Sequence, residues 1–198
     1  MNQSATAEFD PKRARVLDGA MRVFLNYGFA RTTMDDIARA AEMSRPALYL
    51  LFRNKTDIFR AIAQSMLDQS AETTRAELDA DRPFAERMMA AIDKSFIAMM
   101  GLISGSAHGA ELLDMKNSLA CDIAASWREG MRTRLAAAIG REALRLGVDL
   151  PSQGLSAEAL ADLLLDGLEG IKMRIAAPDL QREAARGLVR AIERAIRP

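Results

Sequence analysis

Apolar residues recur at helical spacing along most of the chain. The first such run extends from Val16 to Leu25, after Asp10-Pro11 and before Gly28. Aspartate is a favoured helix N-cap, proline suits the first helical turn, and glycine commonly follows the last turn. The pattern therefore predicts a first helix over residues 10–28.

Two short apolar runs follow, each preceded by a hydroxyl-bearing residue. Thr33 with Asp36 three positions later resembles a capping box, and Ser44 precedes Pro46 as a second N-cap. These signals predict helices over 33–41 and 44–52, separated by a tight turn. Such a pair is a helix-turn-helix that can place the start of its second helix in a DNA major groove. The same pattern also occurs as a purely structural corner of helical proteins.

The rest of the chain continues the helical pattern. Longer helices are expected over 54–78, 84–99, 118–146, 156–176 and 179–196, with a short helix and a loop around the glycines at 101, 105 and 109. No strand-like alternation of any length interrupts them. The predicted fold is all-α with about nine helices, divided into a DNA-binding domain over 1–60 and a helical ligand-binding and dimerisation domain over 61–198.

Charge and composition narrow the class of protein. The net charge is zero, yet residues 1–60 hold ten Lys/Arg against seven Asp/Glu, and residues 61–198 hold seventeen against twenty. This mild asymmetry suits a DNA-binding head on a neutral-to-acidic body. The single cysteine, Cys121, fits a reducing compartment, and the polar N-terminus lacks the apolar core of a signal peptide. The longest uncharged run, 95–110, is too short to span a membrane, so we expect a cytoplasmic protein.

Catalytic and metal-binding patterns are absent from the sequence. It has no glycine-rich phosphate loop, and its one histidine, His108, has no His or Cys at ligand spacing. We therefore expect neither an enzyme nor a metal site nor a cofactor.

The residues of the predicted hairpin carry a more specific signal. Residues 28–38 read GFARTTMDDIA, and residues 44–55 read SRPALYLLFRNK. Both segments closely resemble the tetracycline-repressor (TetR) family, whose motif runs Gly-Phe, Thr-Thr, Ile-Ala, a Ser-capped turn, then Tyr, Phe and Lys. The resemblance covers about residues 11–60. It implies a regulator whose head binds operator DNA and whose body binds a ligand.

Several residues of the hairpin are candidates for DNA contacts. Thr33 and the free N–H groups of its helix can hold a phosphate, and the resemblance implies the same role for Tyr49 and Lys55. Alternatives are a half-buried packing role for Tyr49 and a solvated charge for Lys55. Ser44 is expected to cap its helix and to contact phosphate.

Base reading is expected from the exposed start of the second hairpin helix. The planar guanidinium of Arg45 can pair with guanine O6 and N7, unless it contacts phosphate or remains solvated. Pro46 and Ala47 can pack on a thymine methyl group. Leu50 departs from the polar residue that many relatives carry there, so it either packs against the DNA or is simply an exposed leucine.

The last two predicted helices suggest a subunit interface, because one short recognition helix cannot supply enough contacts for specific binding. Apolar stripes on both helices are wider than one packing partner requires, and would form a four-helix bundle across a two-fold axis. Alternatively, they face only the monomer's own core. The expected homodimer interface comprises Leu160, Leu164, Leu168, Ile171, Leu188 and Ile192.

The central helices are rich in methionine, which adapts to apolar ligands of varied shape, although core filling explains any single methionine equally well. We expect an apolar effector pocket with some polar contacts. Its candidate residues are Met66, Met88, Phe96, Met99, Met100, His108, Glu111, Met115, Trp127 and Met131.

The resulting functional hypothesis is a dimeric, ligand-responsive transcriptional repressor that binds a palindromic operator and is released by a small apolar effector. The alternative is a helical small-molecule-binding or interaction protein whose head has lost specific DNA binding.

Overall fold

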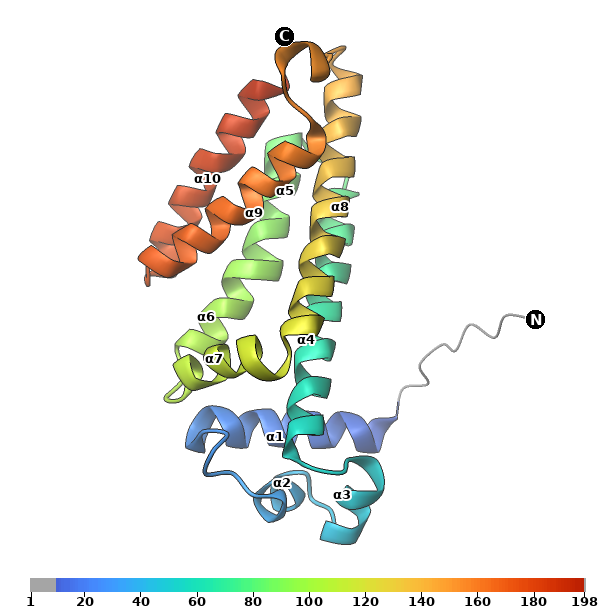
Figure 1. The fold of residues 1–198 in the computed structure, drawn as a ribbon, viewed down its shortest axis with the longest axis vertical. Helices are drawn as coiled ribbons and strands as arrows, with labels where there is room; N and C mark the ends of the chain where they lie inside the picture. Colours follow the sequence, from blue (N-terminus) through green and yellow to red (C-terminus); the bar gives the residue numbers. More distant parts are fainter. Residues whose placement is uncertain (1–9, 198) are drawn as a thin grey trace, which may run out of the picture. The chain divides into compact units, whose positions relative to one another are not determined.

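The computed structural model describes residues 10–197, except for the side chains of 115–117. Throughout this range the chain is helical and contains no strand (Figure 1). The all-α prediction is therefore confirmed. The chain forms two compact units: one comprises the residues up to Ser65 together with Ile103–Ile123, and the other comprises Met66–Leu102 and the residues from Ala124 onward.

The first unit contains the predicted hairpin. Its helices are α1 (Pro11–Tyr27), α2 (Met34–Ala40), α3 (Arg45–Leu51), the beginning of α4 (Lys55–Leu78), and α7 (Gly109–Leu119). Three buried aromatic rings join α1, the following loop and α4: the centroid of Phe29 lies 5.2 Å from that of Phe24 and 5.6 Å from that of Phe59. Offset and edge-on ring pairs of this kind stabilise a core beyond their buried area.

The predicted helix boundaries of the hairpin are confirmed by hydrogen bonds. Asp10 caps α1 by accepting from the amide of Lys12, and Gly28 ends the helix at a φ of 81°. Thr33 and Asp36 form the capping box at the start of α2. Ser44 caps α3 by accepting from the amide of Ala47.

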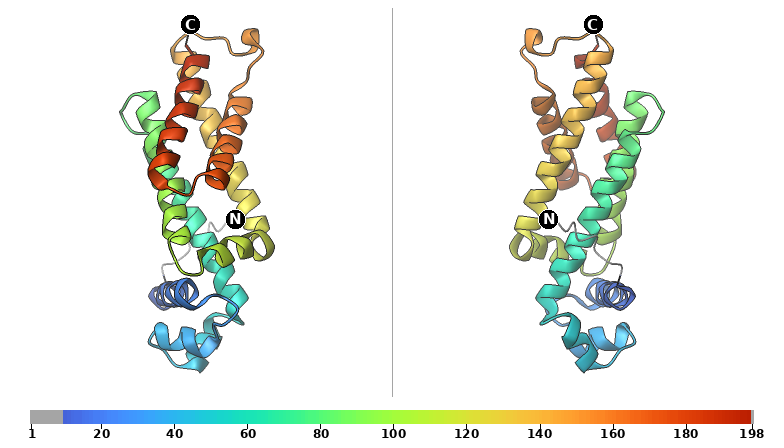
Figure 2. Two further views of the ribbon diagram at one scale, coloured as in Figure 1. Left: turned by 90° about the vertical axis from the view of Figure 1, so that its left-hand side faces the viewer. Right: turned by 90° about the vertical axis from the view of Figure 1, so that its right-hand side faces the viewer.

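The second unit is a helical bundle. It contains the end of α4, then α5 (Phe84–Ile92), the π-helical turn η1 (Asp93–Ile97) and the start of α6 (Ala98–Ser104). These are followed by α8 (Cys121–Arg145) from residue 124 on, the 3-10 turn η2 (Pro151–Gln153), α9 (Ala157–Arg174) and α10 (Pro178–Ala195). Helices α9 and α10 lie side by side, and α10 also packs against α5 (Figure 2).

The sequence pattern predicts one helix over 84–99, whereas the structure has a π-helical turn within it. The turn is fixed by buried hydroxyl groups. Ser70 donates to the carbonyl of Ser95 at 3.0 Å, and the hydroxyl groups of Thr74 and Ser95 lie 2.9 Å apart. A single π turn shifts the register of the side chains that follow it, and periodicity alone does not reveal the shift.

Candidate nucleic-acid interface

The turn between α2 and α3 is closed by a Schellman motif. The amide of Met43 donates to the carbonyl of Ala38 at 3.0 Å, and the amide of Glu42 donates to Arg39 at 3.1 Å. Glu42 takes the left-handed position, at a φ of 53°, where glycine is the usual residue. The sequence predicts a turn here, but it has no glycine after α2 that would predict a Schellman motif. The motif fixes the direction in which α3 leaves the turn.

Helix α3 has one buried side and one exposed side. Leu48 is fully buried and Leu51 is half-buried, while Leu50 is 88% exposed. Ser44, Arg45, Pro46 and Tyr49 are also exposed, and Ala47 is half-buried. The candidate contact residues of α3 therefore lie together on its solvent side.

Arg45 is held over this surface by two neighbours. Its guanidinium lies 3.1 Å from the carboxylate of Asp35 and 5.6 Å from the ring centroid of Tyr49. A hydrogen bond with Tyr49 and the charge of Asp35 raise the pKa of Arg45 further above its ordinary value. Both partners are exposed, so the guanidinium can exchange the carboxylate for another acceptor at small cost.

The hydroxyl of Thr33 is committed to the capping box. It donates to the carboxylate of Asp36 at 2.6 Å and accepts from the Asp36 amide at 3.2 Å. The hydrogen bonds that the hydroxyl and the backbone amide of Thr33 donate to the Asp36 carboxylate lower the pKa of Asp36, and the charge of Arg39 contributes less. Capping is thus the contact that the structure gives Thr33.

Lys55 occupies a different environment from the one expected. Its ammonium group donates to the carbonyls of Phe29, Ala30 and Thr32 at 2.8, 3.1 and 3.0 Å, and lies 4.6 Å from the Phe29 ring centroid. An ammonium group has three N–H donors, so this arrangement uses all of them. In the structure, Lys55 therefore fastens the loop between α1 and α2.

The same loop is held from a second direction by α7. The carboxylate of Glu111 accepts from the amide of Ala30 at 3.0 Å and lies 3.4 Å from Nδ1 of His108. The φ of 81° favours glycine at position 28, and a Cβ atom there, 2.5 Å from the Glu111 carboxylate and 2.9 Å from Nδ1 of His108, would displace both side chains. The sequence does not reveal these contacts, because about 80 residues separate the partners.

A further ion pair fixes the start of α8 within this unit. Arg60 forms two hydrogen bonds to the carboxylate of Asp122, at 2.8 and 2.7 Å, and one to the carbonyl of Leu119 at 2.5 Å. The hydrogen bonds from Arg60 lower the pKa of Asp122 to about 2. No sequence motif marks the pair, whose members are 62 positions apart.

Comparison with known proteins identifies the hairpin. Residues 16–62 match the family model described as "Bacterial regulatory proteins, tetR family". This N-terminal region of the chain is therefore similar to the tetR family. Among curated relatives, the transcriptional activator FasR of Mycolicibacterium smegmatis is 31% identical over 44% of this chain and 40% of its own. The regulator TtgR of Pseudomonas putida is 35% identical over 37% of this chain and 35% of its own. The matches thus span well under half of each relative.

Solved structures extend the likeness of the fold beyond residues 16–62. The fatty acid degradation regulator FadR of Bacillus halodurans aligns with a TM-score of 0.69 at 15% identity, over 92% of this chain and 96% of its own. SmeT, the repressor of the Stenotrophomonas maltophilia multidrug efflux pump SmeDEF, aligns with a TM-score of 0.65 at 20% identity. The alignment covers 92% of this chain and 89% of SmeT. The SmeT–triclosan complex aligns with a TM-score of 0.65 at 18% identity, over 94% of this chain and 91% of its own. At these identities the likeness concerns the fold alone.

The structure separates the residues expected to line an effector pocket. Met88, Met100 and Met131 are buried, and Met66, Phe96, Met99 and Trp127 are half-buried, all in the second unit. His108 and Glu111 belong instead to the first unit, where they contact the loop after α1. Their assignment as polar contacts of the apolar pocket is thereby corrected. The side chain of Met115 lies outside the described residues.

The apolar stripe predicted as the dimer interface lies inside the second unit. Leu164 is completely buried within the single chain, and Leu188 packs against Gly167. The expected interface is therefore wrong for the residues that are already inaccessible in one subunit, namely Leu160, Leu164, Leu168, Ile171 and Ile192. The apolar side chains that α9 and α10 do expose are Leu163, Met173 and Leu180, at 55, 76 and 55%.

Neither a membrane span nor a metal cluster is found in the described part of the chain. Among the residues described, no helix combines the length and hydropathy of a membrane span. Within the same range, no three His, Cys, Asp or Glu side chains gather as metal ligands would.

Proposed function

We propose that this protein is a transcriptional regulator that binds operator DNA as a homodimer and is released by a small apolar effector. The observation that carries the proposal is the exposed side of α3, placed by a capped turn within a hairpin that matches the tetR family. Arg45, Pro46, Ala47 and Leu50 face the bases, and Ser44, Tyr49 and the start of α2 at Thr33 contact the backbone. Repression is the mode that the likeness to SmeT, itself a repressor, supports.

The proposed effector binds among the methionine and aromatic side chains of the second unit. One buried polar atom supports a ligand there: Nε1 of Trp127 has no hydrogen-bond partner within the described part of the chain. A buried donor without an acceptor is costly, so an effector that carries an acceptor would gain a hydrogen bond there. The triclosan complex of SmeT supports the apolar class of ligand.

The proposed dimer forms through the outward faces of α9 and α10. Leu163, Met173 and Leu180 would lose their water contact in a bundle of four helices related by a two-fold axis. Two recognition helices would then reach half-sites separated by one turn of DNA, or a multiple of it.

The DNA contacts are tested by footprinting on the DNA that flanks the protein's own gene. Arg45→Ala is expected to relax base preference by about 1–3 kcal/mol, because a bidentate contact to a base edge is lost. Tyr49→Phe, which removes only the hydroxyl group, is expected to weaken all sequences alike. The matched control is Arg141→Ala, an exposed arginine of α8. Equal footprints from the wild type and both hairpin variants would contradict the proposed interface.

The dimer is tested by sedimentation velocity. Met173→Glu places a charge on the proposed interface and is expected to raise the dissociation constant of the dimer at least about tenfold. The control is Leu144→Glu, on α8, where the leucine is 81% exposed. A wild-type protein that sediments as a monomer at micromolar concentration rules the proposed dimer out.

A further inference from the structure

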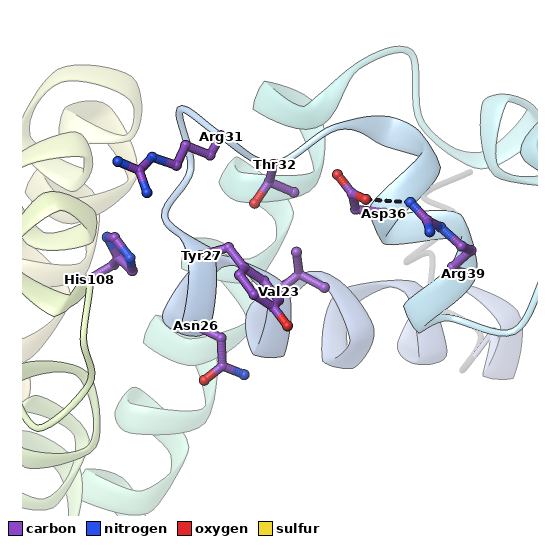
Figure 3. Close-up of a pocket in the computed structure, with 8 residues that line it drawn as sticks. All are labelled: Val23, Asn26, Tyr27, Arg31, Thr32, Asp36, Arg39 and His108. Atoms are coloured by element: carbon purple, nitrogen blue, oxygen red, sulfur yellow. Dashed lines mark hydrogen bonds and ion pairs between the residues drawn. The ribbon is translucent and has the colours of Figure 1, made fainter.

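The first unit contains a cavity of about 440 Å³ that the proposed function does not use. It lies between the end of α1, the loop that leads to α2, α2 itself and His108 (Figure 3). Its lining residues are Val23, Asn26, Tyr27, Arg31, Thr32, Asp36, Arg39 and His108. All of them belong to one unit, so the cavity is complete within it.

The arrangement of the side chains gives the cavity two ends. Arg31 and His108 lie at one end, and the ion pair of Asp36 and Arg39 lies at the other. The Tyr27 ring and the Val23 side chain lie between them, so the middle of the cavity is apolar.

The carboxylates around this cavity are already satisfied. Asp36 accepts from the amide and the hydroxyl of Thr33 through one oxygen, and from Arg39 at 2.6 Å through the other. Glu111, which lies behind His108, accepts from the amide of Ala30 and faces Nδ1 of the imidazole. Either carboxylate would therefore have to give up an existing partner to accept a hydrogen bond from a ligand in the cavity.

The cavity has more free hydrogen-bond donors than free acceptors among its lining side chains. No hydrogen bond or ion pair joins the Arg31 side chain to another described residue. The same holds for the side-chain amide of Asn26 and the hydroxyl of Tyr27. Guanidinium, imidazole, amide and phenol groups together bind an acceptor-rich ligand, and a guanidinium pairs best with a carboxylate or a phosphate.

We propose that this cavity is a binding site for a small carboxylate or phosphate compound with a compact apolar part. The anion lies between Arg31 and His108, and the apolar part packs on Tyr27 and Val23. The site is separate from the effector site proposed in the second unit and does not depend on DNA binding. Because Arg31 and Thr32 directly precede the capping residue Thr33, an occupied site ties the start of α2 to α7.

His108 provides the test, because it is the only histidine in the sequence and its imidazole NMR signals need no assignment. Inorganic phosphate and benzoate are titrated separately into the full-length protein at fixed pH, with sodium chloride at matched ionic strength as the reference. The proposal requires a saturable shift of the His108 signals with at least one of the two anions. The anion that gives it identifies the ligand class.

Arg31→Met is expected to weaken that binding at least about tenfold, because a charge-assisted hydrogen bond is lost. The control is Arg15→Met, an exposed arginine of α1, which is expected to retain wild-type binding. Thermal melting verifies that both variants are folded, as expected for exposed side chains. The proposal is overturned if neither anion gives a saturable shift, if chloride reproduces the shift, or if Arg31→Met binds as tightly as the wild type.

Discussion

Gly19→Ala is expected to lower the free energy of unfolding of the first unit by about 1–3 kcal/mol. A Cβ atom at this position in α1 would lie 2.9 Å from the carbonyl carbon of Ala40 and 2.9 Å from the amide nitrogen of Ala41. Both atoms belong to the backbone at the end of α2, so no side-chain rotation relieves the contact. Helix α2 would have to move away from α1, and the helix-turn-helix would move with it.

Urea unfolding followed by circular dichroism measures this effect, and Gly140→Ala is the matched control. Gly140 also lies within a helix, α8, but its added Cβ would meet only the Cβ of Ala157, at an ordinary 3.6 Å. This substitution is expected to stabilise the protein by about 0.5–1 kcal/mol, because alanine loses less backbone freedom than glycine on folding. Equal effects of the two substitutions would show that the close approach of α1 and α2 is not limiting.

Lys55→Met is expected to destabilise the first unit by about 2–3 kcal/mol, since three carbonyls lose their charged donor. The carbonyls of Phe29, Ala30 and Thr32 all belong to the loop between α1 and α2. Methionine preserves most of the side-chain length, so the loss reports the hydrogen bonds rather than a cavity. Lys12→Met, at an exposed lysine of α1, is the control and is expected to change stability by less than about 0.5 kcal/mol.

The same variant distinguishes a structural lysine from a DNA-contacting lysine. A lysine that contacts phosphate contributes about one unit to the slope of log affinity against log salt concentration. We expect folded Lys55→Met to retain the wild-type slope, measured by fluorescence anisotropy with duplex DNA. A slope reduced by about one unit, with unchanged stability, would instead support the phosphate contact that the sequence suggests.

Local signals in the sequence are sufficient to predict the helix boundaries of the hairpin. Asp10, Thr33 and Ser44 cap the helices that the sequence predicts them to cap, because capping depends on hydrogen bonds within three residues. The π turn at Asp93–Ile97 escapes prediction, because the Ser70 and Thr74 hydroxyls that fix it come from another helix.

Predictions about the partners of individual side chains fail more often. The stripe that includes Leu164 and Ile192 is equally apolar whether it faces a second subunit or the protein's own core, so periodicity cannot choose between the two. Likewise, Lys55 has the same charge whether it binds phosphate or the carbonyls of a loop. Proximity along the chain groups His108 and Glu111 with the methionines, and only the tertiary fold shows that they contact residues 28–30.

The support that Glu111 gives to the amide of Ala30 bears on the engineering of chimeric regulators. A fusion of the first 60 residues to the effector domain of another protein would discard α7. The Ala30 N–H group would then lose its acceptor, and the flank of α1 that α7 covers would be exposed to water. A transplantable N-terminal head must therefore carry a segment equivalent to Ile103–Ile123, grafted as a second, discontinuous insert.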